Sequence, residues 1–184
     1  MHPYLSYFAF AAILAAGGNA VAQPSPVSMY SDISGTACAR HIDDASTGAY
    51  TMDCPGVHGF RLRVLEDDER SSISIVTPNK RVFPLNYWNV VTRGFSMLGT
   101  KAEWRIAKVD GKTAPIAIIV RIHALDQSYP EHPKRVPLLA VAKISRDAAC
   151  VTRAVEALAP DANEQARRFA DNRNMACLPA ESGQ

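Results

Sequence analysis

The sequence lacks the short motifs that mark the commonest catalytic and nucleotide-binding sites. It contains no Gly-x-Ser-x-Gly, no Ser-x-x-Lys, no Gly-x-Gly-x-x-Gly and no Gly-x4-Gly-Lys-Ser/Thr. These absences exclude the enzyme classes that depend on those motifs. They leave open a catalytic site assembled from distant residues, because such sites follow no fixed order along a chain.

A strong excess of charge of either sign is also lacking. The 184 residues include 20 Lys and Arg against 18 Asp and Glu, which gives a formal net charge of +2. A protein dedicated to nucleic acid concentrates its basic residues in a patch or a stripe, and no such concentration is visible here. We therefore expect no nucleic-acid partner. An unknown protein or a component of the cell envelope remains the expected partner.

No hydrophobic run near the amino end reaches the roughly 20 residues that a membrane-spanning helix needs. Residues 5–16 form a shorter apolar run, which Gly17, Gly18 and Asn19 interrupt before the small residues Ala20-Val21-Ala22. This order is typical of a cleavable signal peptide, although the preceding residues lack Lys and Arg. The alternative, a buried core helix, is disfavoured by the Gly and Pro residues that follow. We predict a signal peptide over residues 1–22 and an exported protein, periplasmic or extracellular, without a membrane span.

Cysteine is scarce, but the four cysteines form an even set: Cys38, Cys54, Cys150 and Cys177. In an exported protein, an even set of cysteines is typical of disulfide bonds. Three pairings are possible. We favour Cys38–Cys54 with Cys150–Cys177, because each bond then closes a loop of moderate length within one end of the chain.

The first two cysteines also have an alternative interpretation, since each precedes a histidine. Cys38, His41, Cys54 and His58 have the ligand types and the spacing of a closed, structural zinc site. In an oxidising compartment the disulfide is the better prediction, so the sequence predicts no cofactor and keeps zinc as the alternative.

Alternation of apolar and polar residues predicts a sheet. Residues 23–36 are rich in turn formers and predict a flexible lead-in, followed by a single globular domain over residues 37–180. The tightest turn signal is Asp110-Gly111, which predicts a hairpin. The strands are expected at residues 49–54, 60–64, 70–76, 102–109, 116–123 and 136–144.

Two helices are expected beside these strands. Leu85, Trp88, Val91, Phe95 and Leu98 recur at near-helical spacing and predict a central helix over residues 86–98. A second, carboxy-terminal helix should follow Asp161, with a stripe of small residues that suits close packing on a sheet. The predicted fold class is α+β: a single domain with an antiparallel, meander-like sheet, a central helix and a carboxy-terminal helix packed on it.

The function that fits these observations best is a small, disulfide-containing, exported binding or accessory protein without enzymatic activity. A small secreted hydrolase is the first alternative, with His41 or His123 as the general base in a site assembled in space. A zinc-binding exported domain is the second. The sequence identifies no catalytic residue beyond these candidates.

Overall fold

The computed structural model describes residues 24–126, 128 and 131–180. The predicted signal peptide over residues 1–22 lies outside this part of the chain. The elements, in chain order, are β1 (Val27–Asp32), β2 (Ala39–Asp44), β3 (Ala49–Pro55), β4 (Arg61–Asp67), β5 (Arg70–Val76), β6 (Val82–Pro84), α1 (Tyr87–Val90), β7 (Ser96–Val109), β8 (Lys112–Asp126), β9 (Lys134–Ile144), β10 (Ala149–Glu156) and α2 (Ala162–Asp171).

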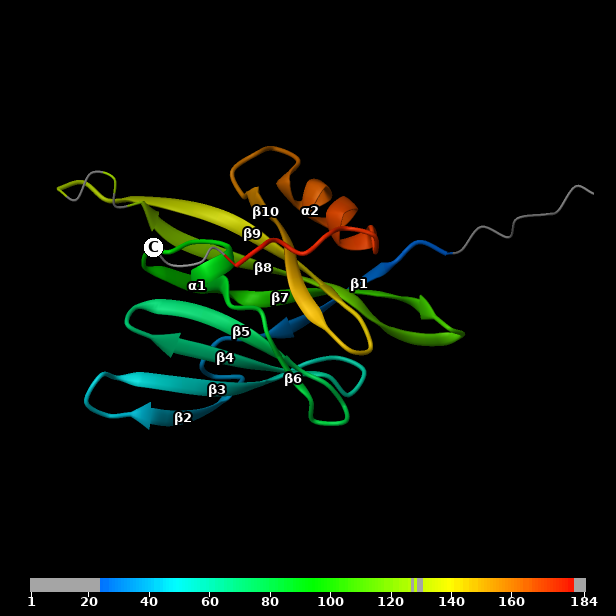
Figure 1. The fold of residues 1–184 in the computed structure, drawn as a ribbon, viewed down its shortest axis with the longest axis horizontal. Coiled ribbons are helices and arrows are strands. Elements are labelled where there is room, and N and C mark those ends of the chain that lie inside the picture. Colours follow the sequence, from blue (N-terminus) through cyan, green and yellow to red (C-terminus); the bar gives the residue numbers. More distant parts are fainter. Residues whose placement is uncertain (1–23, 127, 129–130, 181–184) are drawn as a thin grey trace, which may run out of the picture.

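The strands form one sheet with two antiparallel halves. The strand order is β10-β9-β8-β7-β5-β4-β3-β2, with β1 paired to β7 and β6 paired to β5. Within each half, neighbouring strands are consecutive in the chain, as in a meander. The halves are joined where β5 meets β7 through one parallel pair, Arg70 and Ser96. In Figure 1 the half made of β2–β5 lies below β7–β9, with α1 between them at the left and α2 above.

Tight turns set the register of the hairpins. Asp110 and Gly111 connect β7 to β8 and both have positive φ, 49° and 76°, as a two-residue hairpin turn requires. This confirms the predicted hairpin. Asp68 and Glu69 connect β4 to β5 with φ of 50° and 56°, although neither residue is a glycine.

The middle of β8 is buried on both faces. On one face Ile118, Val120 and Ile122 pack with the apolar side chains of β4 and β5 in the main core. On the other face Ala117 and Ile119 pack against α2. Successive residues of a strand point to opposite faces, so β8 supplies both cores in turn.

The carboxy-terminal helix packs on the sheet as predicted. Its buried residues are Ala162, Ala166 and Ala170, which let the backbone of α2 approach β8 and β9 closely. Among the described residues no helix is both long and apolar enough to cross a membrane.

The predicted central helix over residues 86–98 is wrong. A helix forms only at α1, and the chain is extended again from Ser96, where β7 pairs with β8. The β-branched run Val90-Val91-Thr92 and Gly94 disfavour helix, and the side chain of Asn86 makes no capping hydrogen bond. Tertiary pairing with β8 supplies the backbone hydrogen bonds that a longer helix would have satisfied internally.

The prediction of a flexible lead-in over residues 23–36 is wrong for residues 27–32. These residues form β1, whose register pairs Val27 with Ile106 and Asp32 with Lys101. Local turn formers did not reveal this strand, because its partner lies far away in the sequence. The sheet-rich domain thus begins earlier than predicted.

Candidate functional site

Both predicted disulfides are present. Cys38 pairs with Cys54 across a Cα–Cα distance of 4.3 Å, and Cys150 pairs with Cys177 across 5.6 Å. Cys54 is fully buried in the main core, so the first bond fastens the segment before β2 to the core. The second bond ties β10 to the segment after α2.

The Cys38–Cys54 disulfide uses both cysteines that the alternative zinc site would need as ligands. A zinc site would need Cys38 and Cys54 as thiolates, whereas here they are bonded to each other. Of the two histidines, His41 lies on β2 and His58 in the turn after β3, with φ of 49°. Within the described ranges no group of three or more His, Cys, Asp or Glu side chains is placed to hold a metal ion.

His41, a hydrolase candidate, lies on the exposed surface of β2 beside a carboxylate. Its Nε2 is 3.7 Å from Oδ2 of Asp53. Arg63 also donates to Asp53, with Nε 2.9 Å from Oδ1. This hydrogen bond is the main reason that the pKa of Asp53 lies below its ordinary value. Arg63 and Asp53 thus form a surface ion pair beside His41. In the described part of the chain no hydrogen bond joins a histidine side chain to a hydroxyl group.

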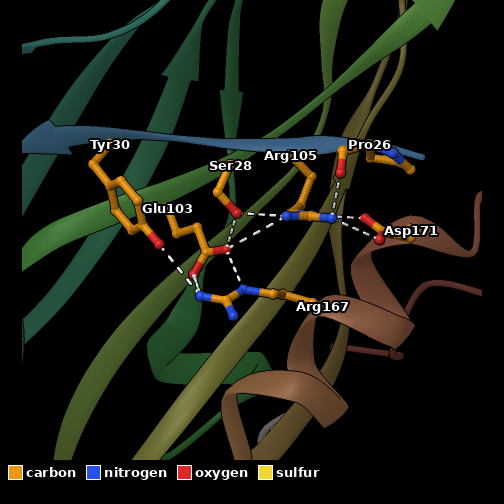
Figure 2. Close-up of polar contacts among 7 residues, drawn as sticks. All are labelled: Pro26, Ser28, Tyr30, Glu103, Arg105, Arg167 and Asp171. Carbon is orange, nitrogen blue, oxygen red and sulfur yellow. Dashed lines mark hydrogen bonds and ion pairs between the residues drawn. The ribbon is translucent and has the colours of Figure 1, made fainter. Parts of the chain in front are cut away.

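A cluster of four charged side chains fastens α2 to the sheet, and we call it the α2 clamp: Glu103, Arg105, Arg167 and Asp171. Arg105, only 7% exposed, donates from Nε and Nη2 to the two carboxylate oxygens of Asp171 at 2.7 and 2.8 Å. Its Nη2 also donates to the carbonyl oxygen of Pro26 at 2.8 Å. Figure 2 shows this guanidinium between β1 and α2, in contact with both.

Glu103 completes the α2 clamp. Arg167 donates to its two oxygens at 2.7 and 3.2 Å, and Ser28 donates to Oε1 as well. Burial raises the pKa of Glu103, but the hydrogen bonds from Arg167 and Ser28 and the nearby positive charges lower it by more. The net shift is below the ordinary value, as expected for a carboxylate that stabilises the fold while ionised. The α2 clamp therefore has a structural role.

A second group of charged side chains surrounds a pocket of about 410 Å³ at the place where the two halves of the sheet meet. We call it the junction pocket. Phe95 and Ser96 contribute to it at the start of β7. The side chains on which its chemistry depends are Glu66, Glu69, Met97, His123, Leu125 and Arg135.

Sheet register brings four of these residues together from distant parts of the chain. Met97 on β7 is directly opposite His123 on β8, and Leu125 on β8 is directly opposite Arg135 on β9. His123 and Leu125 are two residues apart, so they share one face of the sheet. Across the junction, the turn between β4 and β5 supplies Glu69, and the end of β4 supplies Glu66.

Glu66 has the opposite electrostatic character to Glu103. Burial raises its pKa above the ordinary value, and this effect outweighs the hydrogen bond from Ser71 and the positive charge of Arg40. The hydroxyl of Ser71 lies 2.6 Å from Oε2 of Glu66. A half-buried carboxylate with a raised pKa beside a pocket marks a candidate binding or catalytic site.

Two polar groups at the junction are buried without a hydrogen-bond partner. Within the described part of the protein, only three side chains have such an atom, and two of them are Arg70, at Nε, and Ser96, at Oγ. These two residues form the parallel pair that joins the halves of the sheet. Native structures satisfy nearly all buried polar groups, so this concentration of exceptions singles out the junction.

A larger hollow of about 720 Å³ lies beside the Cys150–Cys177 disulfide. Its Lys143 already donates to the carbonyl oxygen of Met175 at 2.8 Å. No unpartnered buried side chain of the described residues lines it. The junction pocket is therefore the better candidate site.

The sequence singled out only part of this site. His123 is its one residue among the candidates predicted from the sequence, as the general base of the hydrolase alternative. Met97 and Arg135 were missed, because only the register of β7, β8 and β9 brings them beside His123. Comparison with known proteins adds no further assignment: the chain matches no family model, no curated protein and no solved structure.

Proposed function

We propose that this chain is a non-enzymatic binding protein of an oxidising compartment and that the junction pocket holds its ligand. The observation that supports this proposal most directly is the group of polar side chains at the junction that the fold does not use. Arg70 and Ser96 have buried atoms without partners, and Glu66 has a raised pKa. An apolar pocket with a few convergent polar groups is the usual form of a small-ligand site.

The two disulfides support an oxidising compartment, because disulfide bonds persist outside the reducing cytoplasm. The protein is proposed to be exported to the periplasm or the medium after cleavage before Gln23. Intact-mass measurement on protein purified from those fractions tests this. The expected mass is that of a chain beginning at Gln23, less about four hydrogens for two disulfides.

The binding proposal is tested by NMR on protein with labelled methionine methyl groups. Met97 lies in the pocket and is 51% exposed, and Met29 on β1 is 41% exposed and serves as an internal control. The probes are a set of small amphipathic amines, carboxylic acids and zwitterions. At least one class should shift the Met97 signal at millimolar concentration and leave the Met29 signal unchanged.

A variant that fills the pocket provides the specificity control. Leu125→Trp places a large ring in the junction pocket and should abolish the shift of Met97. Leu158→Trp, at a site 81% exposed and outside the pocket, should leave the shift intact. A probe set that moves no Met97 signal, or one that acts equally on both variants, overturns the proposal.

The hydrolase alternative also maps partly to this pocket, because His123 lines it together with Glu66. Ester, peptide and glycan substrates should be screened with the unaltered protein, His123→Ala and His41→Ala. Activity that is lost in His123→Ala and kept in His41→Ala would replace the binding proposal by a catalytic one. Equal activity in all three proteins would remove both histidines as the general base.

A further inference from the structure

Resting on the proposed function, we infer that the junction pocket binds a short, free peptide of two or three residues with an apolar side chain. The inference goes beyond binding in general, because it follows from how the charges are arranged around the pocket. Negative and positive groups lie on different sides, and an apolar surface lies between them. A ligand that is complementary to all three must carry both charges and an apolar body.

The strand order separates the charges. Arg135 belongs to β9, while Glu66 and Glu69 belong to β4 and to its turn into β5. In the order β9-β8-β7-β5-β4, the positive side and the negative side are on opposite flanks of β7. The charges therefore face a bound molecule from two directions and would hold an amine at one end and a carboxylate at the other.

The apolar part lies in the middle. Phe95 directly precedes β7, Met97 is the second residue of β7, and Leu125 comes from the neighbouring strand β8. A thioether and an aromatic ring adapt to apolar side chains of different shape, so this surface favours an apolar residue without demanding one particular residue. It disfavours a ligand whose centre is charged, because burial of an unpaired charge is costly.

The distance across the site favours a peptide over a single amino acid. From β9 to β5 there are three strand spacings, each about 4.8 Å, which separate the backbones by about 14 Å. A tripeptide extends over about 10 Å, whereas one residue extends over about 3.5 Å. Side chains of a sheet stand roughly perpendicular to it, so the charged ends of Arg135 and Glu69 stay about as far apart as their backbones. Two hydrogen bonds of about 2.8 Å add to the length of the ligand, so a short peptide spans this distance and a single amino acid, at about 9 Å in all, does not.

The backbone of the acidic side is held in a costly conformation that keeps Glu69 in place. Asp68 and Glu69 both have positive φ, in a turn where Asn-Gly is the usual pair. The carbonyl oxygen of Glu69 accepts a hydrogen bond from the backbone N–H of Ser96 at 2.9 Å. The turn therefore docks directly on the start of β7, beside the apolar surface.

The inference is tested with the tripeptide Ala-Leu-Ala and two blocked forms, titrated by calorimetry and by the Met97 methyl signal. Acetylation of the amine should weaken binding about tenfold in the unaltered protein, and amidation of the carboxylate should do the same. Glu66→Gln combined with Glu69→Gln should remove the penalty for acetylation only. Arg135→Gln should remove the penalty for amidation only.

Matched charge removals outside the pocket are the controls. Glu156→Gln on β10 and Arg146→Gln before it both change exposed residues and should keep both penalties. If Ala-Leu-Ala fails to shift Met97 while other probes still do, the peptide class is wrong and the binding site stands. If no probe of any class shifts Met97, the proposed function itself fails. Penalties that persist unchanged in the pocket variants would also overturn the inference.

Discussion

The α2 clamp and the junction pocket use the same kinds of residue to opposite effect. In the clamp, Glu103 and Arg105 make hydrogen bonds with β1 and α2, and the pKa of Glu103 lies below its ordinary value. In the pocket, the pKa of Glu66 lies above its ordinary value, and Ser96 keeps a buried Oγ without a partner among the described residues. The comparison shows that residue type does not separate structural charges from functional ones. What distinguishes them is whether each charged or polar group already has a partner within the fold.

The largest expected effect comes from breaking the clamp. Arg105→Met should lower the free energy of unfolding by about 3 kcal/mol, because Asp171 and Glu103 then lose a buried positive partner. Arg135→Met in the pocket should change it by at most about 0.5 kcal/mol, because that side chain is exposed. Urea unfolding of both variants measures the difference. Equal losses would mean that the two regions share one role.

A similar loss should follow from removal of the Cys150–Cys177 bond, which closes a segment of 27 residues around α2. Cys150→Ser with Cys177→Ser should cost about 3 kcal/mol, mainly because the unfolded chain gains freedom. Thermal unfolding of this variant, of Arg105→Met and of both combined tests whether clamp and bond act independently. Strictly additive losses would indicate independence, and a smaller combined loss would show that each works by holding α2.

Exchange of each carboxylate for an amide should give effects of opposite sign. Glu103→Gln should cost about 2 kcal/mol near neutral pH, whereas Glu66→Gln should be neutral or stabilising by at most about 1 kcal/mol. In the folded protein the pKa of Glu66 lies above its ordinary value of 4.5. As pH rises from 4.5 through the folded pKa, the wild type should therefore lose stability relative to Glu66→Gln.

For Glu103 the sign reverses, because its folded pKa is lowered below 4.5. Its stabilisation is complete above that pH and is lost as pH falls through the folded pKa. Denaturant unfolding over an acid-to-neutral pH series, with the wild type and both variants, measures both slopes. Parallel pH profiles for the two variants would contradict the comparison.

The smallest expected effect is an increase in stability. Glu69→Gly should raise the free energy of unfolding by about 0.5 kcal/mol, because the relief of a positive φ of 56° outweighs the greater freedom of glycine in the unfolded chain. The same change removes a carboxylate from the junction pocket. A stability gain accompanied by weaker peptide binding would show that a strained position carries a residue used in binding, whereas a stability loss would refute the assigned strain.

Much of the sheet could be predicted because its signals are local. Alternation identified β4, β8 and β9, and Asp110-Gly111 fixed the hairpin between β7 and β8. The disulfide pairing could also be predicted, since each bond stays within one end of the chain. In each of these cases, neighbouring residues in the sequence carry the information.

The failures share a non-local cause. Tyr87 is the residue of α1 that enters the main core, but the helical spacing pointed to Trp88. Beyond α1, pairing with β8 overrode the helical pattern from Ser96 onward. The junction pocket could not be predicted as a site either, because its residues come from four strands and the turn between β4 and β5, and only the folded sheet defines their order.

The pairing of β1 with β7 also governs the order in which the protein can assemble. Residues 27–32 find their partners at residues 101–106, whereas β2–β5 find theirs within neighbouring hairpins. In a chain that emerges amino end first, β1 stays unpaired until most of the sheet-forming sequence has followed it. Contacts between distant residues form more slowly than local ones, so the first strand in the sequence should be among the last to find its place.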